Sequence, residues 1–183
     1  RDHLIFMDQC QGSGVAVVEG PSVEGHVPRV DALVTAAPGL ALAALVADCT
    51  PILLWDNNAG VVAAVHAGRP GLIAGVLPAA LTAMRDLGAR QIHAAVGPSV
   101  CGRCYEVPEQ MRADATRVAP SSSARSWTGT PAIDIATGVV EQLGSAGVGV
   151  TWVAGCTRES PRLYSYRRDG ATGRFAGVVV RRS

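Results

Sequence analysis

One stretch of the sequence constrains the fold and the chemistry of this chain more than any other. It begins Asp48-Cys49-Thr50-Pro51 and ends His66-Ala67-Gly68-Arg69. Between these two motifs, two apolar runs flank the turn-forming residues 56–60, a pattern that predicts a β-hairpin. A hairpin places the start of one strand beside the end of the other. We therefore expect Cys49 and His66 to lie together, as a metal site or a cysteine nucleophile with its base requires.

The composition indicates one globular domain that contains much buried strand. The 183 residues are 48% hydrophobic and 17% charged, and they include 21 glycines, which is unlike a disordered or coiled-coil chain. At this length a single domain over residues 1–183 is expected. The formal net charge of +1 creates no field that would attract nucleic acid or an anionic membrane, so neither is expected as a partner.

The sequence also favours a soluble, cytoplasmic protein. The longest apolar run, residues 40–47, is far shorter than the ~18 residues that a membrane span requires. Five scattered cysteines lack the dense spacing of a secreted disulfide scaffold, and no signal-peptide pattern opens the chain. The sequence begins at Arg1 rather than Met and enters a strand-like run at once, which suggests the later part of a longer polypeptide.

Apolar patterning predicts strands and helices along the whole chain. Beside the hairpin, strands are expected over 4–7, 15–18, 32–35, 40–47, 91–96, 148–154 and 175–180. Helices are expected over 71–87, 108–118 and 136–143. The first two strands flank a glycine-bearing turn, and the polar segments 19–30 and 121–131 are interpreted as connections. The helix that follows His66 brings its N-terminal amides near the Cys49/His66 pair, where they hold an anion or simply start the helix.

Two further clusters of polar side chains admit a functional and a structural interpretation. Cys101-Gly102-Arg103-Cys104 has the spacing of half a zinc site or of a redox pair. No second pair of cysteines or histidines follows at a zinc-finger spacing, so metal binding is not expected there. Tyr164-Ser165-Tyr166-Arg167-Arg168-Asp169 suits phosphate or ribose recognition, although its residue types favour a solvated turn. His26 is interpreted as solvated and His93 as structural.

Several separated motifs together resemble the YfiH/YlmD family. They are Ala47-Asp48-Cys49-Thr50-Pro51, His66-Ala67-Gly68, Gly97-Pro98-Ser99 with Cys104-Tyr105-Glu106-Val107, Cys156-Thr157, and Tyr164-Ser165-Tyr166-Arg167-Arg168-Asp169 with Gly173-Arg174. Members of this family have been described both as multicopper polyphenol oxidases and as purine nucleoside phosphorylases that also deaminate adenosine. The resemblance implies an α/β (α+β) sandwich of mixed sheets with outer helices, similar to the catalytic domain of cytotoxic necrotizing factors.

The resemblance also implies a zinc ion that is held by three side chains. Two of the family's ligands fall on Cys49 and His66. The third is the histidine of a Gln-Val-His-Gly motif, but this chain reads Gln9-Cys10-Gln11-Gly12, with Gln11 at the histidine position. An amide oxygen is a poor zinc ligand, and a catalytic zinc normally keeps three protein ligands. We therefore expect the affinity of the Cys49/His66 site for zinc to fall steeply.

The chain departs from the family pattern elsewhere too. The usual His-Ala-Gly-Trp-Arg-Gly is here His66-Ala67-Gly68-Arg69-Pro70-Gly71, and the preceding family segment with an Arg-Gly-Gly element is absent from the sequence. Strand alternation points Cys10 away from the site. His3 and His26 stay open as replacement ligands that folding could bring in. A total of four histidines is too few for a multicopper centre, so copper is not expected.

Three functions remain open on this interpretation. In the first, phosphate attacks the ribose carbon of a purine nucleoside, or a metal-bound water replaces the amino group of adenosine, at a site of Cys49, His66 and Gln11. In the second, a metal-free hydrolase or transferase uses Cys49 as nucleophile, His66 as base and Gln11 as a donor near the oxyanion. The third is a non-catalytic binding protein. The oligomeric state is not predicted, and the candidate substrate contacts are Arg69, Tyr164, Arg167 and Arg174.

Overall fold

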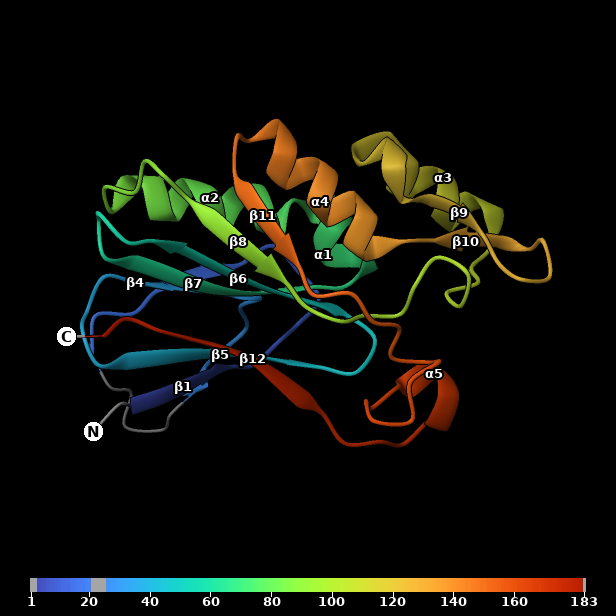
Figure 1. The fold of residues 1–183 in the computed structure, drawn as a ribbon, viewed down its shortest axis with the longest axis horizontal. Coiled ribbons are helices and arrows are strands. Elements are labelled where there is room, and N and C mark those ends of the chain that lie inside the picture. The colour runs from blue at the N-terminus through green and yellow to red at the C-terminus, as the bar shows by residue number, and fades with distance from the viewer. Residues whose placement is uncertain (1–2, 21–25, 183) are drawn as a thin grey trace.

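The computed structural model describes residues 3–20 and 26–182, and within them two mixed β-sheets pack face to face (Figure 1). The larger sheet has the strand order β11-β8-β6-β7-β4-β2, and the smaller has the order β12-β5-β1-β3. The larger sheet consists of β2 (Val15–Val17), β4 (Ala32–Thr35), β6 (Thr50–Asp56), β7 (Val61–Ala67), β8 (His93–Val96) and β11 (Gly149–Trp152). The smaller consists of β1 (His3–Met7), β3 (His26–Val27), β5 (Leu40–Val46) and β12 (Phe175–Val180).

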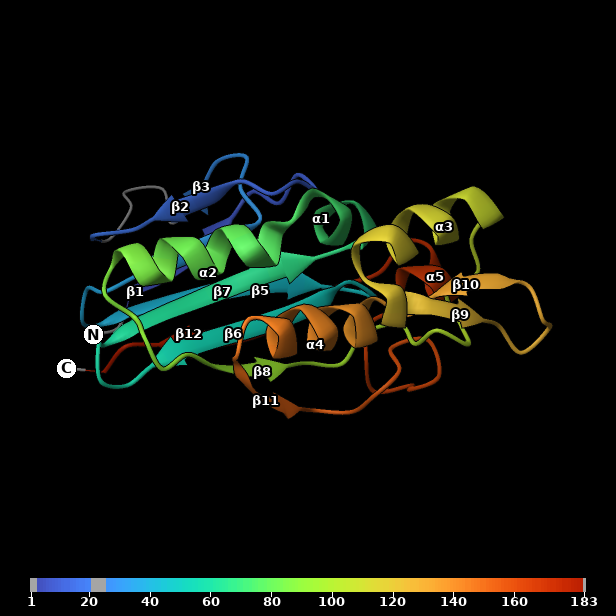
Figure 2. The same ribbon diagram turned by 90° about the horizontal axis from the view of Figure 1, so that it is seen from above.

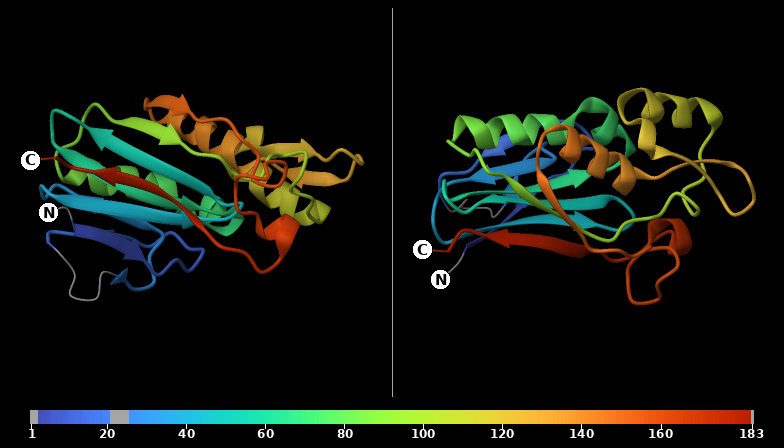
Figure 3. Two further views of the ribbon diagram at one scale, coloured as in Figure 1. Left: turned by 60° about the horizontal axis from the view of Figure 1, so that its bottom comes forward. Right: turned by 45° about the horizontal axis from the view of Figure 1, so that its top comes forward.

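Helices cover the outer face of the larger sheet (Figure 2). Those above the sheet are α1 (Arg69–Ala74), α2 (Val76–Asp86) and α4 (Ile135–Ser145). At one end of the molecule lie α3 (Glu109–Val118), the 3-10 turn Pro120–Ser122, the ribbon of β9 (Ser123–Arg125) and β10 (Pro131–Ile133), and α5 (Tyr166–Asp169). The chain ends lie at the opposite end (Figure 3). The expected α/β sandwich is confirmed, and the single-domain interpretation stays a prediction.

The two faces of strand β7 belong to two different cores. Val61, Ala63 and Val65 pack in the core under the helices, whereas Val62 and Ala64 pack in the core between the two sheets. A strand that is buried on both faces carries apolar side chains on both of them, which explains why its sequence is a continuous apolar run rather than an alternation of apolar and polar residues. Side chains along a strand alternate between faces. His66 therefore lies on the face of β7 that is directed towards the space between the two sheets.

The chain crosses from one sheet to the other just before Cys49. Strand β5 belongs to the smaller sheet and β6 to the larger, so residues 47–49 form the crossing. Asp48 sits there with a φ of 92°, a region that non-glycine residues rarely adopt. Its Oδ1 accepts a hydrogen bond from Thr157 Oγ1 at 2.6 Å, and its Oδ2 accepts one from the amide of Arg167 at 2.6 Å. These two hydrogen bonds hold the strained turn and place Cys49 at the end of the sandwich.

The structure corrects several predictions of local structure. The strands predicted at 4–7 and 15–18 do not pair with each other, because β1 pairs in parallel with β5 while β2 pairs in parallel with β4 of the other sheet. The helix predicted over 71–87 is two helices, since Gly75 has a φ of 81° and interrupts the hydrogen-bond ladder.

Two predicted connections also contain strands. Part of the expected loop 19–30 forms β3 beside β1, and residues 21–25 lie outside the described residues. The polar segment 121–131 contains β9, which pairs with β10. Short polar strands lack the apolar alternation that identifies a strand in a sequence. Within the described ranges, no helix has the length and apolar character needed to cross a membrane.

The carboxylate of Asp56 ties the turn between β6 and β7 to the segment before β8. Its Oδ1 accepts hydrogen bonds from the amides of Asn58 and Ala59, and its Oδ2 accepts them from the amides of Arg90 and Gln91. The four donor–acceptor distances are between 2.7 and 3.1 Å. These four backbone hydrogen bonds, of which the one from Ala59 has the largest effect, lower the pKa of Asp56 to about 2.

We predict that Asp56→Asn lowers the free energy of unfolding by about 2 kcal/mol near neutral pH, because a neutral amide replaces a carboxylate that accepts four hydrogen bonds. The pKa of Asp56 is lower in the folded state than in the unfolded state. Its contribution is therefore fully present above about pH 4 and is lost as the pH falls towards 2. Urea unfolding at several pH values measures the difference between variant and wild type.

The matched control is Asp86→Asn, a change at an exposed carboxylate at the end of α2. It is expected to leave the free energy of unfolding within about 0.5 kcal/mol of the wild type. A loss of stability in Asp56→Asn that stays constant between pH 6 and pH 3 would contradict this account of the turn.

Candidate functional site

A cleft of about 840 Å³ opens at the end of the sandwich where β1, β5 and β7 finish. Its walls include the crossing residues Asp48 and Cys49, His66 at the end of β7, and arginines from three separate segments. This volume lies within the roughly 300–1,000 Å³ of typical small-molecule sites. The cleft is the place in the described structure where the residues singled out from the sequence come together.

The hairpin brings Cys49 and His66 together, as the sequence predicts. In the antiparallel pairing of β6 with β7, Pro51 lies opposite His66 and Thr50 lies opposite Ala67. Cys49, one residue before β6, therefore meets the end of β7. His66 is 3% exposed and Cys49 is half-buried, and both line the cleft.

Asp31 completes this pair, and the sequence interpretation missed it. It lies just before β4, and its main-chain oxygen accepts a hydrogen bond from the amide of His66 at 2.8 Å. Its side chain is fully buried, and Oδ1 lies 2.8 Å from Nδ1 of His66. Nδ1 donates to this carboxylate, so the ring nitrogen Nε2 is left for Cys49. The only signal in the sequence is a lone aspartate ahead of an apolar strand.

Asp31 also shapes the loop that carries Gln11. Its carboxylate accepts hydrogen bonds from the amides of Gln11 at 3.1 Å, Gly12 at 2.7 Å and Cys10 at 3.3 Å. The Cys10 thiol points to the same carboxylate, at 3.3 Å, rather than into the Cys49/His66 pair. Gln11 is held at a φ of 62°, which turns its side chain into the cleft. One buried carboxylate therefore positions two members of the site.

The amide of Gln11 lies against Cys49 in a space that glycine keeps open. Its Nε2 lies 3.6 Å from Cys49 Sγ and donates to it. A Cβ added to Gly68 would lie 2.1 Å from Gln11 Oε1 and 3.1 Å from Cys49 Sγ. A side chain at position 68 would therefore displace the amide of Gln11 from Cys49, whereas glycine leaves room for this contact.

The charges of the three central groups depend on one another. Burial raises the pKa of Asp31, but hydrogen bonds from His66 and the loop amides outweigh it and lower that pKa to about 2. Burial lowers the pKa of His66, but Asp31 and Cys49 outweigh it and raise that pKa to about 9. Burial raises the pKa of Cys49, but the imidazole of His66 outweighs it and lowers the pKa of the thiol. At neutral pH the site holds an imidazolium between a carboxylate and a thiol with increased thiolate character.

Three arginines line the cleft and give it a positive charge. They are Arg69 at the start of α1, Arg167 in α5 and Arg174 before β12. Within residues 3–20 and 26–182 none of them forms an ion pair with a carboxylate. Arg167 lies over the ring of Tyr105 at 4.5 Å and donates to the main-chain oxygen of Glu106. Unpaired guanidinium groups in a cleft suit an anionic ligand.

Not every predicted contact lies in the cleft. Tyr164 lines a separate, smaller depression and packs against Gly173, whereas Tyr166 lines the cleft itself. Helix α1 is only six residues long. The anion-binding character of the cleft therefore rests on the three arginines rather than on the long helix start that the sequence suggested.

The residues at the cleft do not fit a three-ligand zinc ion. Cys49 and His66 are two good ligands, and Asp31 orients the imidazole as a zinc site would need. The third position is the amide of Gln11, whose nitrogen faces the thiol. His3 lies at the far end of β1 from the cleft, and His26 stacks on Phe6, so neither replaces the missing ligand. Among the described residues, one group of three or more side chains is arranged so that it could hold a metal ion, and this group lies outside the cleft.

Comparison with protein families decides the relationship. Residues 1–182 match the family described as multi-copper polyphenol oxidoreductase laccase. The chain belongs to this family. Among relatives of the laccase-like family, a Streptomyces coelicolor protein named purine nucleoside phosphorylase is 55% identical over 96% of this chain and 74% of its own length. A Streptomyces griseus protein with the same name is 54% identical over 97% of this chain and 74% of its own length.

Solved structures of the laccase-like family share the fold. A Neisseria meningitidis protein superposes with a TM-score of 0.86 at 29% identity, covering 100% of this chain and 76% of that one. YlmD from Geobacillus stearothermophilus superposes with a TM-score of 0.85 at 28% identity, covering 100% of this chain and 74% of that one. The resemblance to the YfiH/YlmD family that the motifs indicated is therefore confirmed.

We predict that iodoacetamide alkylates Cys49 faster than Cys10 at neutral pH, although Cys10 is the more exposed thiol. The imidazole of His66 lowers the pKa of Cys49, whereas the carboxylate of Asp31 raises the pKa of Cys10. In His66→Gln the alkylation of Cys49 should slow, by about tenfold for each unit by which its pKa rises. Peptide mass spectrometry over time measures each rate separately.

The control variant is His93→Gln, which changes an exposed histidine on β8. It should leave the alkylation rate of Cys49 unchanged. Equal alkylation rates for Cys49 in the wild type and in His66→Gln would show that the imidazole does not activate the thiol.

Proposed function

We propose that this chain catalyses the phosphorolysis of purine nucleosides in the cleft at Cys49 and His66. The observation that carries the proposal is one cleft that contains both a buried proton-transfer group and three arginines that form no ion pair with a carboxylate among the described residues. Such a cleft suits phosphate on one side and a leaving base on the other. The names of the two Streptomyces relatives support the same reaction. They also favour an enzyme over a non-catalytic binding protein.

In this reaction phosphate replaces the purine at the anomeric carbon of the ribose. A phosphate oxygen forms the new C–O bond while the C–N bond to the purine breaks, and its electron pair stays on the base. His66, protonated at neutral pH, donates a proton to the purine ring nitrogen as the bond breaks. The imidazole then regains a proton from the hydrogen phosphate that has reacted or from water. The products are ribose 1-phosphate and the free purine.

The other groups of the cleft have distinct parts in this proposal. Arg69, Arg167 and Arg174 bind and orient the phosphate. Cys49, when it is ionised, stabilises the imidazolium and the positive charge that develops on the ribose as the glycosidic bond breaks. Gln11 donates to Cys49 and fixes the thiol's position. The exposed ring of Tyr166 offers a face on which the purine stacks.

Deamination of adenosine is not part of the proposal. That reaction needs an activated water molecule. Cys49, His66 and Gln11 do not form the three-ligand set that would hold a metal ion able to activate it. An assay with adenosine separates the two reactions, because phosphorolysis releases adenine while deamination releases inosine.

We predict that the purified chain converts inosine and phosphate into hypoxanthine and ribose 1-phosphate, and that Cys49→Ala abolishes the reaction. Arg69→Ala and Arg174→Ala should each raise the KM for phosphate by about 10- to 100-fold, since each removes a charge-assisted contact worth about 1.5–3 kcal/mol. Coupled detection of hypoxanthine at varied phosphate concentration measures these constants.

The matched control is Arg117→Ala on α3, whose guanidinium pairs with Asp114 away from the cleft. It should leave the KM for phosphate unchanged. Base release that does not depend on phosphate, or that survives in Cys49→Ala, would refute the proposed reaction.

A metal-free cysteine hydrolase or transferase is the second candidate. It is favoured by the order Asp31, His66, Cys49, in which a carboxylate orients an imidazole that faces a thiol, with the Gln11 amide alongside. This reaction would pass through an acyl group on Cys49. Intact-protein mass spectrometry with activated esters would then show an adduct that Cys49→Ser removes and phosphate does not affect.

A further inference from the structure

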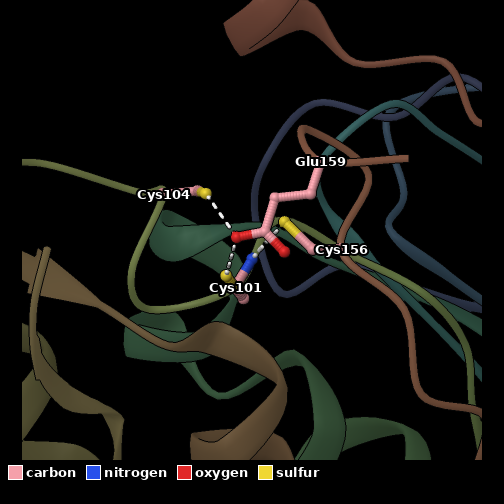
Figure 4. Close-up of side chains that lie close together, drawn as sticks. All are labelled: Cys101, Cys104, Cys156 and Glu159. Carbon is pink, nitrogen blue, oxygen red and sulfur yellow. Dashed lines mark hydrogen bonds between the residues drawn. The ribbon is translucent and has the colours of Figure 1, made fainter. Parts of the chain in front are cut away.

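A second group of reactive side chains lies outside the cleft and has no part in the reaction proposed above. Cys101 and Cys104 come from the loop after β8, and Cys156 and Glu159 come from the loop after β11 (Figure 4). One ligand atom from each of the four lies within 4.8 Å of all the others. Cys104 is buried, and Cys101 and Cys156 are half-buried.

The topology of the larger sheet brings the two loops together. Strands β8 and β11 pair in parallel, so their following loops leave the same edge of the sheet. A parallel bridge between Ser99 and Cys156 extends this pairing into the loops. The amide of Cys101 donates to Cys156 Sγ at 3.4 Å. The thiols therefore converge through main-chain pairing rather than through a chance encounter of surface side chains.

One carboxylate oxygen lies at the centre of the group. Glu159 Oε1 accepts from Cys104 Sγ at 3.2 Å and from Cys101 Sγ at 3.8 Å, as Figure 4 shows. It also accepts from Trp127 Nε1 at 3.4 Å. The carboxylate is already anionic, and the three thiols become anionic when a bound cation displaces their protons, so the group can offer four anionic donor atoms.

We propose that Cys101, Cys104, Cys156 and Glu159 form a structural zinc site. Three thiolates and one carboxylate make a closed set of four ligands, which is the number that structural zinc requires. Zinc–sulfur bonds of about 2.3 Å in a tetrahedron set sulfur–sulfur distances of about 3.8 Å. The ligand atoms need to draw together by at most about 1 Å from their present separations.

The choice of zinc follows from the donor types. Three thiolates exclude the hard cations Mg²⁺ and Ca²⁺, which prefer oxygen ligands. An iron–sulfur cluster normally takes four cysteines, and the carboxylate favours zinc over the softer Cu⁺. A zinc ion with these four ligands carries a net charge of −2. Arg103, which lies over the ring of Trp127 at 4.5 Å, provides a nearby positive charge.

The site would hold one wall of the cleft in place. Thr157, next to Cys156, donates to Asp48 at the crossing turn, and the amide of Val100, next to Cys101, donates to the main-chain oxygen of Asp48. Tyr105, next to Cys104, carries Arg167 on its ring. A zinc ion that ties the two loops together therefore stabilises the conformation of Asp48 and the position of Arg167 without contacting substrate.

The test is the metal content of protein purified without a histidine tag and without chelator, measured by plasma mass spectrometry. The proposal predicts about one zinc per chain. Cys104→Ser and the double variant Cys101→Ser/Cys156→Ser should lose the zinc, whereas Cys49→Ser should retain it. Zinc that persists in the double variant but disappears in Cys49→Ser would place the metal at the cleft and overturn the proposal. Absence of zinc, with a disulfide among the three cysteines, would overturn it too.

A measurement on the unmutated protein guards against variants that fail to fold. Zinc is replaced by Co²⁺, and the visible spectrum is recorded. A tetrahedral site with three thiolates gives intense d–d bands together with a strong sulfur-to-cobalt charge-transfer band. A charge-transfer band with only about one-third of the intensity expected for three thiolates would identify a site with a single cysteine, and the proposal would then be wrong.

Discussion

The hydrogen bond between Asp31 and His66 is the contact on which the candidate site depends. Asp31 is fully buried, and its carboxylate is shared between the imidazole and the amides of the loop around Gln11. A buried carboxylate is stable only when such donors compensate for the lost hydration. The same donors fix the tautomer and the position of His66. The cost of burying one charge is thus offset by interactions that also build the site.

The sandwich supplies the rest of the geometry through one crossing between the sheets and one hairpin. The chain passes from the smaller sheet to the larger at Asp48, and the hairpin of β6 and β7 then returns it to His66. Asp48 accepts hydrogen bonds from Thr157 and Arg167, which lie more than a hundred residues later. The cleft is therefore assembled from the start, the middle and the end of the described chain. A local change at any of these segments is expected to reach Cys49 through Asp48.

The parts of this arrangement that depend on local patterns were predictable from the sequence. The apolar runs around residues 56–60 predict the hairpin, and the hairpin alone places Cys49 near His66. Asp31 was not predictable, because its role follows from the pairing of β4 with β7, a contact between strands distant in sequence. Cys156 and Glu159 were missed beside Cys101 and Cys104 for the same reason, since a search by spacing finds only ligands that are close along the chain. Gly75 shows that a local pattern can also mislead, because the apolar stripe in the sequence continues across the break between α1 and α2.

The most direct test of the account is the kcat of Asp31→Asn for inosine phosphorolysis, measured together with the KM for phosphate on protein shown to be folded by circular dichroism. An asparagine keeps the shape of the side chain but removes the charge that holds His66 protonated and oriented. The account predicts that kcat falls by about 100-fold or more while the KM for phosphate changes little. A folded Asp31→Asn variant with the kcat of the wild type would contradict it.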